Sequence, residues 1–149
     1  MMFCAMGAVS GWRVPQYVGW GIVLAGLVGC GRSGPALVPV EGQVTFQGQP
    51  LKTGSLLFQP DAAKGNSSTL TPSGTIGPEG RYKLYTQERP GAPPGWYKVG
   101  IVAQEAPPND PYAMRSLIPQ RYGDPQTSGI SIEVSANAPA GAYDIRLTP

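Results

Sequence analysis

From residue 38 to the end of the chain, apolar and polar residues alternate in short segments that are separated by turns. Such period-two alternation is the pattern of β-strands that bury one face and expose the other. In the segment 38–46, valines and Phe46 occupy one face, whereas Glu41, Gln43 and Thr45 occupy the other. The same pattern, or a short apolar run, recurs at 55–59, 74–76, 81–86, 96–103, 130–134 and 142–147. The chain therefore has about seven predicted strands.

The predicted fold is all-β, a seven-stranded antiparallel β-sandwich over residues 38–149. Strands with one polar face belong to antiparallel sheets that have one face in water. Two such sheets hide their apolar faces against each other, which favours a sandwich, and an open barrel is the alternative. The 21 glycines and 17 prolines agree with this interpretation, because both residues disfavour long helices.

A long connection separates the strand that ends at Ala103 from the strand that begins at Ile130. Loops of this length are often functional, and whether this one has a role is left open. We expect a short helical turn at 112–117, followed by an extended return path at 118–125 that is stiffened by prolines.

The first thirty residues follow a different pattern. Arg13 precedes an uncharged apolar run at 18–29, and Met1, Met2 and Met6 are alternative starts. As a helix this run would reach about 18 Å, well short of the roughly 30 Å hydrocarbon core of a bilayer. We therefore expect residues 1–29 to be a signal peptide rather than a permanent spanning helix.

Leu27, Val28, Gly29 and Cys30 close the apolar run and resemble the lipobox of bacterial lipoproteins. The resemblance implies that the thiol of Cys30 receives a diacylglyceryl group and that a peptidase cleaves just before this residue. Acyl chains on Cys30 would hold the protein on the cell membrane or outer membrane, facing the periplasm or the cell exterior. Residues 30–37 would then be the lipidated cysteine and a short tether.

The charged residues are few and scattered, with a formal net charge of +2. No basic stripe could neutralise a phosphate backbone, so we expect no nucleic-acid partner. The chain has no histidine, which removes Ser-His-Asp triads, Cys-His pairs and histidine zinc sites. A lipidated Cys30 is no nucleophile, and Asp110 and Asp124 lack the spacing of a calcium loop. We expect no enzyme activity, no metal and no cofactor.

Three aromatic residues, Tyr85, Trp96 and Tyr112, are candidates for a binding platform on which a sugar or peptide could stack. Tyr85 and Trp96 both fall on the polar faces of predicted strands that we expect to be adjacent. The alternative is that these rings cover the edge of the fold or pack beneath the long loop.

The order of several short motifs resembles the carboxypeptidase regulatory-like domains. The motifs lie at Val40–Val44, Gly48–Leu51, Gly54, Phe58–Pro60, Glu79–Leu84 and Gly95–Val99. Two later motifs, Ile118–Tyr122 and Tyr143–Leu147, resemble the version of this domain on small planctomycete lipoproteins. The resemblance implies a transthyretin-like Greek-key sandwich without catalytic residues.

Two functions are compatible with these features. The first is a noncatalytic, lipid-anchored module of the cell envelope that binds an envelope protein or a glycan or has a structural role. The second is a small-ligand carrier with a cavity or a dimer channel. An exposed edge strand would favour the first, whereas an apolar pocket above roughly 300 Å³ would favour the second.

Overall fold

The computed structural model describes residues 34–149, and their regular structure is β-strand apart from two 3-10 turns. These turns are η1 (Ala62–Lys64) and η2 (Gln120–Gly123). No helix in this part of the chain is long and apolar enough to cross a membrane. The all-β prediction is confirmed.

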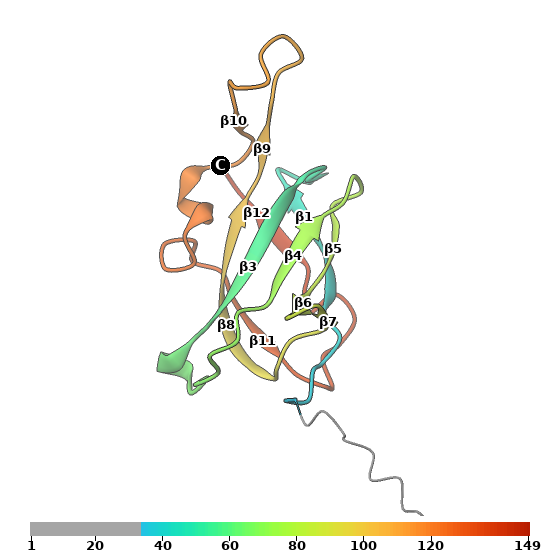
Figure 1. Cartoon of the computed structure of the whole chain (residues 1–149), viewed down its shortest axis with the longest axis vertical. Helices are drawn as coiled ribbons and strands as arrows, with labels where there is room; N and C mark the ends of the chain where they lie inside the picture. Colours follow the sequence, from blue (N-terminus) through green and yellow to red (C-terminus); the bar gives the residue numbers. More distant parts are fainter. Residues whose placement is uncertain (1–33) are drawn as a thin grey trace, which may run out of the picture. The chain divides into compact units, whose positions relative to one another are not determined.

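Seven strands form the path of the main sheet (Figure 1). They are β1 (Glu41–Phe46), β3 (Gly54–Pro60), β4 (Ser73–Ile76), β5 (Arg81–Lys83), β8 (Gly95–Val102), β11 (Ser131–Val134) and β12 (Ile145–Leu147). The two-residue strands β2 (Gln49–Pro50), β6 (Tyr85–Thr86) and β7 (Arg89–Pro90) extend this sheet. A separate hairpin consists of β9 (Gln104–Glu105) and β10 (Arg115–Ser116). Each of the seven predicted segments overlaps one strand of the main path.

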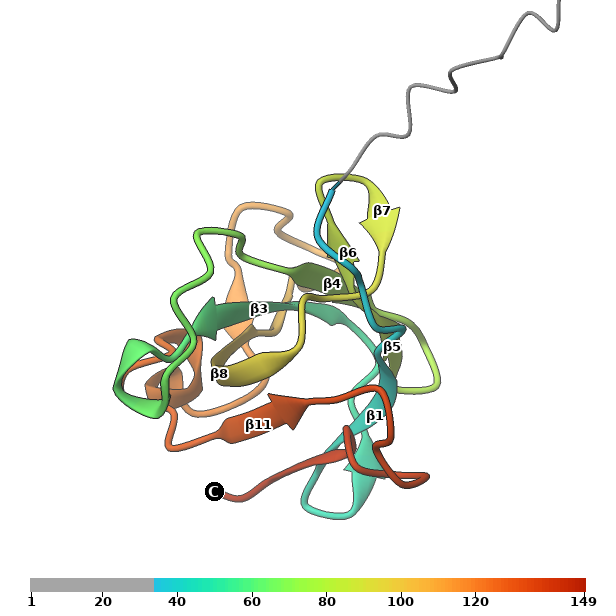
Figure 2. The ribbon, with the colours of Figure 1, turned by 90° about the horizontal axis from the view of Figure 1, so that it is seen from below.

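The hydrogen-bonded order of the path is β11-β8-β3-β4-β5-β1-β12, and the sheet curls as a half-barrel around the core (Figure 2). Neighbouring strands on the path are antiparallel except β1 and β12, which are parallel. The expectation of antiparallel pairing throughout is wrong for this pair, because the connection 135–144 carries the chain from one edge strand to the other. The path is continuous, so its hydrogen bonds do not divide the strands into two sheets.

The buried face of the sheet is the apolar face that the alternation predicted. Its largest fully buried side chains include Tyr82, Tyr97 and Phe58. The ring of Phe58 lies 6.5 Å from that of Tyr82 and 5.9 Å from that of Tyr97, centroid to centroid. Buried tyrosine hydroxyls need partners, and Tyr82 donates to the carbonyl of Tyr143 at 2.6 Å. Tyr97 likewise donates to the carbonyl of Pro93 at 2.8 Å.

Two further tyrosine hydroxyls bind the backbone just after β11 and β12, which are the two edge strands of the path. The hydroxyl of Tyr143, just before β12, bonds both the N–H and the carbonyl of Ser135, just after β11. The hydroxyl of Tyr122 on η2 bonds both the N–H and the carbonyl of Thr148, just after β12. Strand edges carry unpaired backbone groups, and here each hydroxyl satisfies one donor and one acceptor at such an edge.

The long connection differs from its prediction. Arg115 and Ser116, expected in a helical turn, pair with β9 instead. The 3-10 turn lies at η2, inside the segment expected to be extended. Tyr122 lies on this turn, and its side chain is buried in the core. Gly100 on β8 makes room for this segment, since an added Cβ would lie 2.8 Å from the ring of Pro125.

Candidate functional site

An open groove with a volume of about 1110 Å³ lies on the outer face of β1, β3, β4 and β5, opposite the core. We call it the outer groove. Its side chains include Glu41, Gln43, Ser55, Ser73, Thr75, Arg81, Lys83, Tyr85 and Asp144. It thus lies on the polar face that the alternating pattern exposes.

Strand register arranges these side chains in rows across the sheet. Glu41 is opposite Lys83, and Ser55 is opposite Thr75. Because Ile76 pairs with Tyr82, Thr75 also faces Lys83 across β4 and β5, so one row crosses four strands. Directly opposed residues on neighbouring strands lie close enough for their side chains to interact.

A second row runs beside the first and contains the groove's exposed ring. Ser73 lies between Tyr85 on one neighbouring strand and Leu57 on the other. Tyr85 is 46% exposed and Leu57 is 43% exposed. This end of the outer groove therefore presents a hydroxyl flanked by apolar surface.

The charges of the outer groove are already engaged with protein groups. The Nζ of Lys83 lies 2.8 Å from Oε1 of Glu41, and this hydrogen bond raises the pKa of Lys83. Asp144 accepts a hydrogen bond from the backbone N–H of Gln43 at 3.0 Å. The Nε of Arg81 lies 3.7 Å from Oε2 of Glu79, which is a weaker contact.

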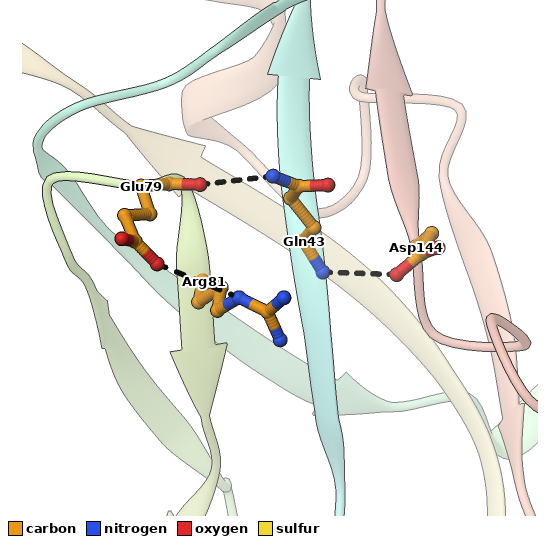
Figure 3. A network of polar contacts seen from close by, with 4 residues as sticks. All are labelled: Gln43, Glu79, Arg81 and Asp144. Carbon is orange, nitrogen blue, oxygen red and sulfur yellow. Dashed lines mark hydrogen bonds and ion pairs between the residues drawn. The ribbon is translucent and has the colours of Figure 1, made fainter.

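Figure 3 shows how Gln43 connects the two sides of this network. Its backbone N–H contacts Asp144, while its side-chain amide donates to the carbonyl of Glu79 at 2.9 Å. The two acids and two bases that line the groove balance each other in charge. Tyr82 lies beneath them, and burial raises its pKa, so this phenol stays neutral.

The structure does not bring the three candidate aromatic residues together. Tyr85 lines the outer groove. Trp96 on β8 is half-buried, with the Nζ of Lys64 over its ring at 3.9 Å from the centroid. Tyr112 is 93% exposed in the turn between β9 and β10. The expectation that Tyr85 and Trp96 lie on adjacent strands is wrong, because β3 and β4 separate β8 from β6.

A smaller hollow of about 420 Å³ lies between the β1–β2 turn and the β9–β10 hairpin. Phe46, Leu51 and Leu117 supply its apolar wall. Half of its lining residues are polar or charged: Gln49, Lys52, Thr53 and Glu105. Its volume exceeds the lower limit of roughly 300 Å³ for a carrier site, but the hollow is open to solvent and only part of its lining is apolar.

The sequence pattern placed Glu41 and Gln43 on one polar face, and Arg81, Lys83 and Tyr85 on another, without relating the two. Register makes these faces one site, and nothing in the pattern indicated which strand would pair with β1. Asp144 enters the site only through the parallel pairing of β1 and β12, which places it beside Gln43.

Among residues 34–149, no group of three or more acidic, cysteine or histidine side chains is arranged to hold a metal ion. The lipobox at Leu27, Val28, Gly29 and Cys30 lies outside the described residues. No family model, curated protein or solved structure matches this chain.

Proposed function

We propose that this protein is a noncatalytic, lipid-anchored module of the cell envelope that binds an extended polymer, protein or glycan, in the outer groove. The observation that carries the proposal is the groove itself, a long open surface of polar side chains beside an exposed tyrosine ring. Ligand sites combine apolar surface with a few convergent polar groups. An open groove suits a chain that continues beyond the site at both ends.

A noncatalytic role is supported by the state of the ionisable groups. Glu41 binds Lys83 and raises the pKa of Lys83, so this amine stays protonated. A general base must be free to take a proton near the operating pH. Lys83 does not meet this requirement, which favours binding over catalysis in the outer groove.

The proposed anchor rests on the apolar run at 18–29 and on the lipobox that ends at Cys30. The proposal includes the resemblance to carboxypeptidase regulatory-like domains, in which a transthyretin-like sandwich would correspond to the two halves of the curled sheet. The carrier function is the weaker candidate, because the hollow at Phe46 and Leu117 is open to solvent and does not enclose a ligand.

The test is photo-crosslinking in intact cells with a benzophenone amino acid at position 85. We expect the probe to capture an envelope component, since Tyr85 lines the outer groove. The matched control carries the same probe at position 112, which is also exposed but lies on a different hairpin. Capture that is equal at both positions, or absent at position 85, would contradict the proposal.

A further inference from the structure

Building on the proposed function, we infer that the outer groove selects an uncharged, hydroxyl-rich glycan chain and discriminates against charged polymers and peptides. Four features of the groove support this inference: its charge balance, its floor, its exposed ring and the pairing of its strands.

The charge balance disfavours a charged ligand. Glu41 and Lys83 bind each other at 2.8 Å, and Asp144 is held by Gln43. An anionic polymer would compete with Glu41 for Lys83 and would meet two carboxylates in the same groove. A cationic polymer would meet Lys83 and Arg81 in the same way. An uncharged chain can bind without breaking the ion pair or the hydrogen bond, so its binding does not include the free-energy cost of disrupting them.

The floor of the groove offers hydroxyls. Ser55, Ser73 and Thr75 point outward from two adjacent strands, and all three are exposed. Each hydroxyl can both donate and accept a hydrogen bond. Sugar hydroxyls have the same dual capacity, so such a floor can bind them in several orientations. Small side chains also keep the floor low enough for a chain to lie across it.

The exposed ring supplies the apolar contact that sugar recognition needs. Tyr85 stands directly opposite Ser73 and exposes nearly half of its surface. A pyranose has an apolar face of C–H groups and a rim of hydroxyls. An aromatic ring beside a hydroxyl floor matches both features at once. Leu57 extends the apolar surface on the other side of Ser73.

The pairing of the strands argues against an extended peptide. Peptides often bind by adding a strand to a sheet edge, where unpaired backbone groups are available. Here β1, β3, β4 and β5 are each paired on both sides. The groove therefore offers side chains rather than a backbone template.

The test measures binding of the full chain, purified in detergent, to three kinds of probe by isothermal titration calorimetry. The probes are a panel of neutral oligosaccharides built from glucose, mannose, galactose and N-acetylglucosamine, a uronic-acid oligosaccharide, and a pool of random decapeptides. We expect at least one neutral oligosaccharide to bind, with an affinity that does not change with salt, because no ion pair forms. Tyr85→Ala should weaken this binding about tenfold or more through loss of ring contact, whereas Tyr85→Phe retains it.

Tyr112→Ala is the matched control, since it removes an exposed tyrosine that lies outside the groove. Salt-dependent binding of the uronic-acid probe, or preferential binding of peptides, with loss in Tyr85→Ala would overturn the inference and leave the proposed function standing. Binding of none of the probes overturns it as well. If position 85 also captures nothing in cells, the proposed function falls with it.

Discussion

Four tyrosine hydroxyls form hydrogen bonds with backbone groups in this protein. Tyr82 and Tyr97 each donate to a backbone carbonyl within the core, and Tyr122 and Tyr143 each bond an N–H and a carbonyl at a strand edge. The described domain contains no cysteine, so no disulfide supports it. Hydrogen bonds and apolar packing must hold the curled sheet.

Tyr82→Phe should lower the free energy of unfolding by about 1–3 kcal/mol. The substitution keeps the ring against Phe58 but leaves the carbonyl of Tyr143 without its donor. Chemical denaturation measures the loss. Tyr85→Phe, which removes an exposed hydroxyl, is the control and should change stability by less than about 0.5 kcal/mol. Equal effects of both variants would contradict this assignment.

Tyr122 should titrate apart from the other tyrosines. Hydrogen bonds with Thr148 and Arg121 lower the pKa of Tyr122 from 10.0 to about 8. A lowered pKa means that ionisation of this phenol stabilises the fold; the gain is complete above the unfolded pKa of about 10 and is lost as the pH falls through about 8. Absorbance titration should therefore show tyrosinate forming near pH 8.

The control for this titration is Tyr122→Phe, which should remove the step near pH 8 and leave the later ones. Ionisation of Tyr82 has the opposite effect on stability, because burial raises the pKa of this phenol. Its contribution to stability is therefore complete below pH 10 and is lost only as the pH rises above that value. A wild-type titration without a step below pH 9 would show that Tyr122 is not perturbed as described.

At the scale of the elements, β1 and β12 form the contact that the chain pattern did not predict. They are parallel, with Val44 opposite Ile145. Gly42 permits this approach, because a Cβ at that position would collide with the carbonyl oxygen of Tyr143. The same contact brings Asp144 to the outer groove, so one glycine serves both the fold and the site.

Gly42→Ala should destabilise the fold by about 1–3 kcal/mol, because the added methyl meets backbone rather than a flexible side chain. The matched control is Gly123→Ala, whose Cβ would find only ordinary contact with Val102 at 3.9 Å. Thermal unfolding of both variants measures the difference. A smaller loss in Gly42→Ala than in Gly123→Ala would argue against the close approach of β1 and β12.

The whole molecule combines a folded domain with a proposed lipid anchor. Cys30→Ala should release the protein from membranes and abolish incorporation of an alkyne fatty acid, because the thiol is the proposed attachment point. Each buried methylene group contributes about 0.8 kcal/mol, so two or three acyl chains are enough for stable anchoring. Membrane fractionation and metabolic labelling measure both effects. If the wild type takes up no label, or the variant labels equally, the anchor assignment is wrong.

The sequence alone determined the all-β class, the position of the seven strands on the main path and, where residues alternate, the side of a strand that faces the core. Alternation is a local property, so it could be read without knowing any partner strand. Val40, Tyr82 and Val99 are buried as their register in the pattern required. The local pattern did not predict η2, because the burial of Tyr122 on this turn depends on contacts with the distant core.

Only the tertiary structure decided how the strands pair and what their outer faces form together. The outer groove depends on Glu41 lying opposite Lys83 and on Asp144 lying beside Gln43, which are separated by about 40 and 100 residues of chain. Contacts between residues so far apart in the sequence form only when the whole sheet folds. The alternation of residues within one strand does not contain this information. It could therefore indicate Tyr85 as a candidate, but not the groove residues beside it, such as Ser73.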